Sequence, residues 1–187
     1  MKNLLLPVAL ILNIVSVLPY IRDILHRKTK PSIVTWSTWA LLTGVATAAE
    51  FAAGEYTTAI FTLVSTIGAL SVALLGLRYG HAGYTIIDFI CQIGALVGLA
   101  LWITLNNPLL AVLTMIFIDF IGAIPTFRHV WRHPEEETAS AYAIGTASAI
   151  FSILSLTSHS VVALAFPVYL AFADAALAGL IRFRSRT

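Results

Sequence analysis

The sequence predicts an all-α integral membrane protein with seven transmembrane helices, arranged as two parallel three-helix repeats joined by a linker helix (a 3-1-3 order). Three observations predict this fold class. Apolar runs of about 20 residues follow one another along the chain. Positive charges occur in alternate loops, and one stretch of the first half recurs in the second half.

The composition excludes an ordinary soluble domain. Of the 187 residues, 59% are hydrophobic and only 11% are charged, which is too little polar cover for a surface in water. The runs are continuously apolar rather than alternating, which favours helices over membrane-spanning strands. The single cysteine, Cys91, excludes an intramolecular disulfide. Only Lys2 precedes the first run and no small-residue cleavage site follows it, so we expect a retained helix rather than a signal peptide.

Short segments rich in Gly, Pro, Asn and Ser separate the predicted helices, because these residues interrupt helical structure. The predicted helices cover residues 3–24, 33–53, 57–77, 84–105, 109–131, 139–157 and 160–182. The first three-helix repeat then occupies residues 1–80, the linker helix 81–107, and the second repeat 108–187.

Nearly all positive charges lie on one side of the predicted bundle. Ten of the eleven Lys and Arg residues lie at the C-terminal end of the first, third, fifth or seventh helix or just beyond it: Arg22, Arg27, Lys28, Lys30, Arg78, Arg128, Arg132, Arg182, Arg184 and Arg186. Basic loops stay on the cytoplasmic side, so the N-terminus is expected outside and the C-terminus in the cytoplasm, in the cell (inner) membrane. A missed or added helix would scramble this separation, so the charges also support seven helices.

The repeat joins the segment at residues 12–36 to the segment at 118–142. A shift of 106 residues superposes four pairs: Asn13 on Asp119, Pro19 on Pro125, Arg22 on Arg128 and Trp36 on Tyr142. A shift of 104 residues places Arg78 on Arg182, at the ends of the third and seventh helices. Since a single unpaired helix lies between the two units, both units enter the membrane from the same side, which is the parallel type of repeat.

This arrangement resembles the PQ-loop superfamily, which includes the SWEET and SemiSWEET sugar transporters, the lysosomal cystine and cationic amino acid exporters, and the KDEL receptors. The likeness covers the whole chain in topology, although the family's Pro-Gln pair reads Pro19-Tyr20 and Pro125-Thr126 here. The sequence Asp119-Phe120-x-Gly122 is similar to the cystine-exporter segment whose aspartate serves proton coupling. Asp174 also sits where that branch carries an acid. The sugar branch favours Asn on its third and seventh helices, and neither helix has one here.

Four acids interrupt the apolar runs: Glu50, Asp88, Asp119 and Asp174. A buried charge is costly, so such acids line a cavity, form pairs or hold a proton. Asp119 precedes Arg128 by nine residues and Asp174 precedes Arg182 by eight, which places both acids about 12–13 Å deep at 1.5 Å per residue. Asn13 lies equally deep, so all three are expected near the middle of a slab about 30 Å thick.

The candidate proton-coupling residues are Asp119, Asp174 and Asp88. Asp88 starts a polar stripe with Cys91 and Gln92 on the fourth helix. It is either a functional acid or one that is hydrogen-bonded to a neighbouring helix. Glu50 lies four residues before Gly54, near the outer interface, where its carboxylate is expected to reach water.

A solute site is expected where the polar groups converge. The candidate binding residues are Asn13, Trp36, Trp39, Gln92, Asp119, Tyr142 and Asp174. Trp36 has a second interpretation as an interfacial anchor, because it lies close to a basic loop. Trp39 is one helical turn deeper and could stack on a solute. Tyr142 holds the corresponding position in the second repeat.

Pro19 and Pro125 are candidate hinges. An interior proline lacks the N–H that continues the helix and bends it. Because the two prolines occupy matching positions, they could allow the repeats to rock between inward-open and outward-open states. The alternative is an ordinary kink of the kind that membrane helices tolerate.

The sequence carries no phosphate-binding glycine loop, HExxH motif or catalytic triad, so we do not expect an enzyme, a metal site or a cofactor. The leading hypothesis is a small secondary transporter of a small polar solute, amino acid-like or sugar-like, with protons as the coupling ion. The alternatives are a non-transporting receptor or binding module of the same fold, or a membrane subunit whose acids mediate partner contacts. The expected partners are the solute, membrane lipid and, in one arrangement, a second copy of the chain, but no nucleic acid.

Overall fold

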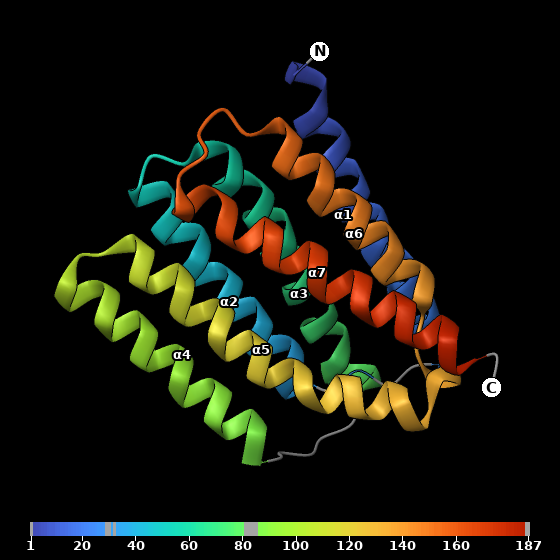
Figure 1. Ribbon diagram of the computed structural model, residues 1–187. Coiled ribbons are helices and arrows are strands. Elements are labelled where there is room, and N and C mark those ends of the chain that lie inside the picture. Colours follow the sequence, from blue (N-terminus) through green and yellow to red (C-terminus); the bar gives the residue numbers. More distant parts are fainter. Residues whose placement is uncertain (1, 29–30, 32, 81–85, 186–187) are drawn as a thin grey trace.

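The computed structural model describes residues 2–28, 31, 33–80 and 86–185, and in this part of the chain the secondary structure is helical throughout (Figure 1). The elements are α1 (Lys2–Leu25), α2 (Ile33–Ala52), α3 (Tyr56–Tyr79), α4 (Ile86–Leu105), α5 (Pro108–Arg132), the short 3-10 helix η1 (Pro134–Glu136), α6 (Ala139–Ser155) and α7 (Val161–Arg184). A helix forms at every predicted position, and its ends lie within two residues of the predicted ends.

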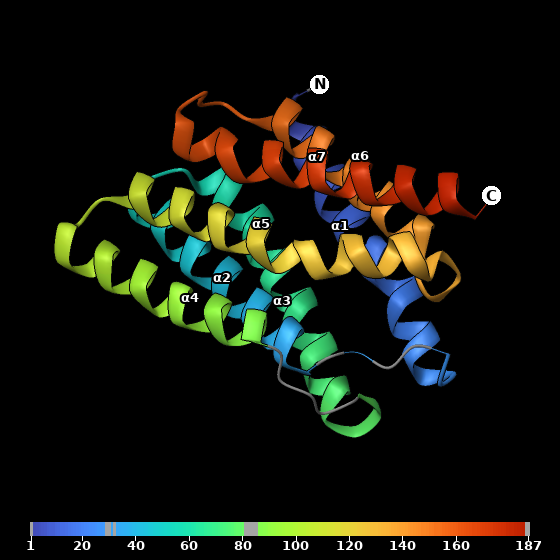
Figure 2. The same ribbon diagram turned by 60° about the horizontal axis from the view of Figure 1, so that its bottom comes forward.

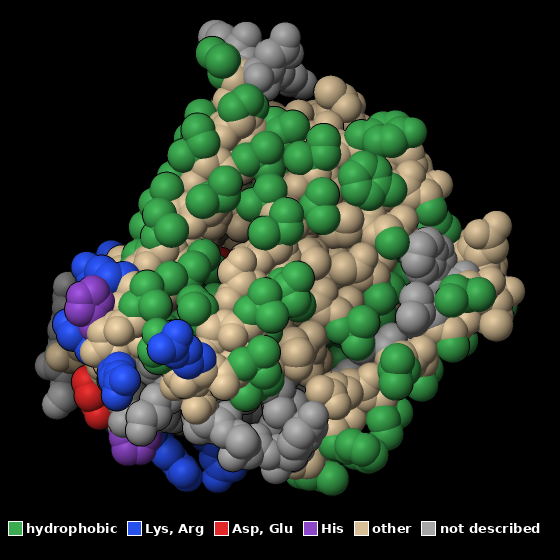
Figure 3. All heavy atoms as spheres, turned by 180° about the vertical axis from the view of Figure 1, so that it is seen from behind, with side chains coloured by type: hydrophobic (Ala, Val, Ile, Leu, Met, Phe, Trp, Pro, Cys, Tyr) green, Lys and Arg blue, Asp and Glu red, His purple; other side chains and the backbone are tan. Residues whose placement is uncertain are grey.

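Four of the described helices are long and apolar enough to cross a membrane: Leu4–Leu25, Tyr56–Tyr79, Pro108–Arg132 and Val161–Arg184. The segment Ala139–Ser155 is a shorter apolar helix. Large apolar side chains such as Leu74, Phe117 and Phe172 are more than half exposed. Figure 3 shows hydrophobic side chains spread over one face, with Lys and Arg gathered at one end. Such an apolar surface fits an integral membrane protein. That all seven helices span the membrane stays a prediction.

Each half of the chain places its third helix between the other two. Helix α3 packs against both α1 and α2, and α7 packs against both α5 and α6. The two halves meet where α1 packs along α6 and where α2 packs against α5 (Figures 1 and 2). Helix α4 lies at the side of the bundle, against α5 and α2. Six helices therefore surround the middle of the bundle, and α4 stays outside this ring.

The two ends of the bundle differ in charge. The end that carries the α1–α2 loop, the α5–α6 loop and the last turn of α7 holds exposed Arg and Lys side chains, and we call it the basic end. The opposite end carries the α2–α3, α4–α5 and α6–α7 connections. The first of these is a tight turn in which Gly54 has a φ of 77°, a left-handed conformation that glycine adopts without steric cost.

Small side chains allow the helices to approach closely. One buried cluster joins Ala9 of α1, Phe61 of α3 and Ala149 of α6, and all three are fully buried. A second joins Ala49 of α2 to Ala111 and Val112 of α5. Packing through small residues is typical of helices in lipid, where close van der Waals contact replaces the hydrophobic effect as the driving force.

The two prolines lie inside their helices. Pro19 is an interior residue of α1. Helix α5 continues through position 125 and bends partway along its length, in the yellow-to-gold part of Figures 1 and 2. The side chain of Pro125 lies outside the described residues, so a hinge at Pro19 and Pro125 stays a prediction.

Candidate functional site

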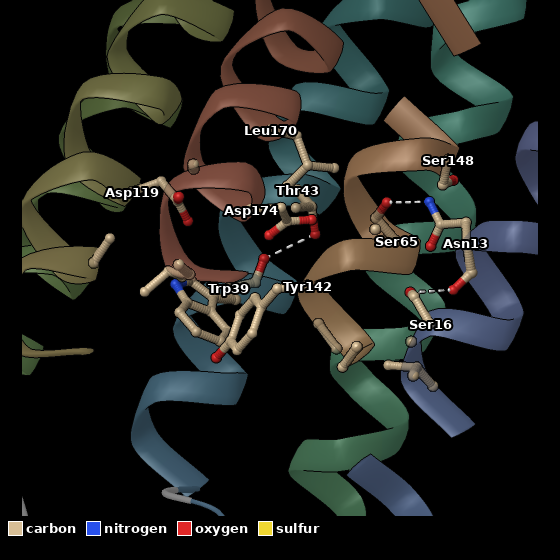
Figure 4. A pocket seen from close by; sticks show the side chains of 18 of the residues that line it. Asn13, Ser16, Trp39, Thr43, Ser65, Asp119, Tyr142, Ser148, Leu170 and Asp174 are labelled. Carbon is tan, nitrogen blue, oxygen red and sulfur yellow. Dashed lines mark hydrogen bonds between the residues drawn. The ribbon is translucent and has the colours of Figure 1, made fainter. Parts of the chain in front are cut away.

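A cavity of about 200 Å³ lies in the middle of the bundle, between the six ring helices. Every one of these helices contributes lining residues: Asn13 and Tyr20 from α1, Trp39 and Thr43 from α2, Ser65 from α3, Asp119 from α5, Tyr142 and Gly145 from α6, and Tyr169 and Asp174 from α7. The polar groups come from segments far apart in the sequence, and only the packing of the two halves brings them together (Figure 4).

One wall of the cavity is acidic. Asp119 on α5 accepts a hydrogen bond from the hydroxyl group of Tyr169 on α7. Asp174 lies five residues beyond Tyr169 on the same helix and lines the same cavity as Asp119. In Figure 4 Asp119 and Asp174 approach the cavity from neighbouring helices. Two carboxyl groups that share one cavity disfavour double ionisation, so together they can hold a proton at this wall.

The opposite wall is polar and neutral. The side-chain amide of Asn13 donates a hydrogen bond to the hydroxyl group of Ser65 on α3 over 2.8 Å. The hydroxyl groups of Ser16 and Ser148 donate to the backbone carbonyls of Asn13 and Ala9 over 2.7 Å each. Figure 4 shows Asn13, Ser65 and Ser148 together on the side away from Asp119. A solute in the cavity would meet amide and hydroxyl groups on one side and carboxyl groups on the other.

Aromatic rings lie between the acids and the basic end. The ring centroids of Tyr20 and Trp36 are 5.0 Å apart, and those of Trp36 and Trp39 are 4.9 Å apart at an angle of 82°, which is an edge-to-face pair. Across the cavity, the hydroxyl group of Tyr142 donates to the carboxylate of Glu137 over 3.2 Å. All four of these aromatic residues line the cavity, and we call them the aromatic layer: Tyr20, Trp36, Trp39 and Tyr142.

A glycine makes room for Asp174. Gly145 of α6 faces α7, and a Cβ atom built on it would overlap the carboxyl group of Asp174. Gly145 is buried and lines the cavity, so only a residue without a side chain lets α6 approach this acid.

Gly145→Ala is expected to push the Asp174 carboxyl group out of its position, at an overpacking cost of about 1–3 kcal/mol in folding stability. Solute binding should weaken, because a carboxyl group of the cavity is displaced. The measurement is a binding titration of the purified protein. Gly179→Ala on α7 is the matched control, because a Cβ atom there meets nothing within 4 Å. Equal binding by the two variants would show that the Gly145–Asp174 contact does not matter.

The structure brings six of the seven predicted binding residues to the cavity: Asn13, Trp36, Trp39, Asp119, Tyr142 and Asp174. Gln92 is placed elsewhere, on the outlying helix α4, and does not line the cavity. The side chain of Asp88, on the same helix, lies outside the described residues. Tyr169, which bonds to Asp119, was not predicted, because an aromatic residue in an apolar run gives no sign of where it points.

The expectation for Glu50 was wrong. It was predicted to reach water, but the structure buries it completely. The turn at Gly54 folds α3 back over this end of α2, and α5 and α7 cover the neighbouring Ala49. The prediction relied on the short distance between Glu50 and the end of its helix, and the sequence does not show that other helices cover this end.

Among the described residues, no three His, Cys, Asp or Glu side chains are grouped so that they could hold a metal ion. Comparisons with protein-family models, with curated proteins and with solved structures give no match. The fold and the site together define a class, a helical membrane protein with a central cavity that has an acidic wall.

Proposed function

We propose that this chain is a small secondary transporter that moves a small polar solute by alternating access, with protons as the coupling ion. The observation that carries the proposal is the central cavity, in which Asp119 and Asp174 meet a neutral polar wall and an aromatic layer. Substrate sites of secondary transporters lie near the midplane, at the interface between repeats. The basic end is then cytoplasmic by the positive-inside rule.

Two three-helix repeats with α4 as the linker are part of the proposal. Under the shifts of 106 and 104 residues, Asn13 and Ser65 correspond to Asp119 and Tyr169. Asn13 bonds to Ser65 as Asp119 does to Tyr169. The α1–α6 contact of Ala9 with Ser148 likewise corresponds to the packing of Met115 with Leu42 between α5 and α2. Equivalent contacts at equivalent positions support a duplicated unit.

The cavity also favours a class of solute. Its volume of about 200 Å³ is below the roughly 300–1,000 Å³ of pockets for drug-sized molecules, so the solute is small. None of the lining residues in the described part of the chain is Lys, Arg or His, whereas two are aspartates. Aromatic faces and carboxyl groups attract cations. Within the range of amino acid-like and sugar-like solutes, a molecule with an amino group fits this lining best.

In the proposed mechanism, Asp119 and Asp174 take up a proton from one side of the membrane. They release it to the other side when the cavity closes toward the first side and opens toward the second. The hydroxyl group of Tyr169 fixes one oxygen of Asp119, which leaves the second oxygen to take up the proton. The aromatic layer lines the cavity on the side of the basic end, and in this mechanism bending at Pro19 and Pro125 would move it. Coupling follows if the solute and the proton favour the same conformation.

Flux through proteoliposomes tests the transporter. Uptake of radiolabelled amino acids by wild-type protein is expected to accelerate when the outside is made more acidic than the inside, because inward proton movement then drives the solute. Uptake that ignores the pH gradient would contradict proton coupling. The alternative, a non-transporting receptor of the same fold, predicts saturable binding to the purified protein with no flux into vesicles.

A further inference from the structure

A buried carboxyl group outside the cavity has no role in the mechanism above. Glu50 lies on α2 close to the end opposite the basic end, and none of its surface is exposed. Within the described part of the chain, neither of its carboxyl oxygens has a hydrogen-bond partner. Nearly all buried polar groups in proteins are hydrogen-bonded, so an unpartnered buried acid needs an explanation.

One side of this turn of α2 is apolar and closely packed. Ala49, Ala111 and Val112 are fully buried there, and Val162 and Ala165 of α7 pack against them. An ionised carboxylate beside such packing loses its hydration, and the neighbouring hydroxyl of Thr62 replaces only a small part of it. A bound proton removes the charge. A hydrated metal ion would need space and several oxygen ligands, which close packing does not give.

The charged groups near Glu50 do not stabilise a negative charge. Glu55, in the adjoining turn, is also an acid, and its negative charge disfavours a second negative charge on Glu50. Glu55 is itself held by hydrogen bonds from Ser158 over 3.0 Å and from Ser160 over 2.5 Å. The residues of α5 and α7 that pack against this turn are apolar, α3 presents the hydroxyl group of Thr62, and His159 lies exposed in the α6–α7 connection.

Threonine hydroxyl groups lead from Glu50 to the cavity. They form a threonine seam between α2 and α3, made of Thr43, Thr47, Thr62 and Thr66. Thr43, Thr47 and Glu50 follow one face of α2, at spacings of four and three residues. Thr43 lines the cavity.

Hydrogen bonds join the members of the seam. The Thr47 hydroxyl donates to the Thr43 carbonyl over 2.8 Å and lies 3.4 Å from the hydroxyl of Thr66. Thr66 in turn donates to the carbonyl of Thr62 over 3.0 Å. The hydroxyl of Thr62 is buried, has no partner among the described residues, and lies beside Glu50.

We propose that Glu50 is a second proton-binding site, separate from the aspartates of the cavity, and that the threonine seam connects it with the cavity. The geometry that carries this is a wholly buried, unpartnered carboxyl group at the end of a line of hydroxyl groups that begins at the cavity wall. A proton at Glu50 does not require that the protein transports a solute.

Infrared difference spectra between acidic and alkaline pH test the site on the full chain in lipid nanodiscs. In the double variant Asp119→Asn/Asp174→Asn, which lacks the cavity acids, the spectrum is expected to show the C=O band of a protonated carboxylic acid. Adding Glu50→Gln to this variant is expected to remove the band, whereas adding Glu135→Gln, which removes an exposed acid, should leave it. A band that survives when Glu50→Gln is added, or that disappears when Na⁺ is added, would overturn the proposal.

Two further variants keep the test open if Glu50→Gln does not fold. Thr62→Val has nearly the same shape, and it is expected to shift the frequency of the band because it removes the neighbouring hydroxyl; an unshifted band would count against the site. Thr47→Val should slow the rise of the band after a pH jump about tenfold, which is a barrier about 1.4 kcal/mol higher, because it removes the hydroxyl that faces Thr66. The control is Ser71→Ala, which removes an outlying hydroxyl of α3, and its band should rise at the wild-type rate. If the band rose equally fast in Thr47→Val and Ser71→Ala, the threonine seam would not connect Glu50 with the cavity.

Discussion

Asp119→Asn is expected to uncouple solute uptake from the pH gradient. One pH unit across the membrane supplies about 1.36 kcal/mol per proton, so wild type that carries one proton per solute can accumulate the solute up to about tenfold. Asparagine has the shape of aspartate but cannot take up and release a proton. The Tyr169 hydroxyl can still donate to the amide oxygen, so the α5–α7 contact survives. The variant should therefore equilibrate the solute without accumulating it.

The measurement is uptake of a radiolabelled amino-acid mixture into proteoliposomes whose interior is one pH unit more alkaline than the exterior. Glu135→Gln is the control, because Glu135 is an exposed acid beyond α5 whose side chain is 69% accessible. It should accumulate solute as wild type does. Accumulation by Asp119→Asn at the wild-type level would exclude Asp119 as the coupling acid and would direct attention to Asp174.

Trp39→Leu is expected to weaken solute binding by a factor between about 2 and 30, which corresponds to the loss of a cation–π contact of about 0.5–2 kcal/mol. The indole of Trp39 lines the cavity and also packs on the buried cluster of Leu42 and Met115. Leucine keeps an apolar group against this cluster while it removes the aromatic face. The effect on binding is thereby separated from an effect on folding.

Thermal-shift titration with the amino acid that stabilises wild type measures this change, since a ligand that binds only the folded state raises its apparent stability. Phe172→Leu on α7 is the matched control, because Phe172 is 75% exposed on the outer surface. It should leave the binding constant unchanged. If Trp39→Leu bound as tightly as wild type, the aromatic layer would have no part in recognition.

Much of the cavity could be predicted from the sequence because depth in a membrane can be counted along a helix. Asn13, Asp119 and Asp174 were placed at one level by their distance from basic helix ends, and all three line the cavity. Which face of a helix points toward the cavity cannot be read from the sequence in the same way, because a helix that is apolar on every side has no polar face to mark it. Gln92 illustrates this, because its polarity marked it as a site residue whereas its helix lies outside the ring.

Partners across helices were also beyond the sequence. The bond between Tyr169 and Asp119 joins residues 50 positions apart, and the fit of Gly145 around Asp174 depends on the approach of α6 to α7. Nothing local distinguishes Tyr169 from an interfacial tyrosine or Gly145 from an ordinary small residue of a membrane helix. Their positions follow from the packing of two surfaces that meet only in the folded bundle.

By itself the sequence determined where the helices begin and end, that their surface is suited to lipid, and at which level the acids lie. These properties are local, because they depend on the length of apolar runs and on the charges that end them. Only the tertiary structure decided that Asp119 meets Tyr169, that the cavity has an acidic wall and a neutral wall, and that Glu50 is sealed from water. The physical reason is that burial and pairing arise from contacts between helices, which an almost uniformly apolar sequence leaves open.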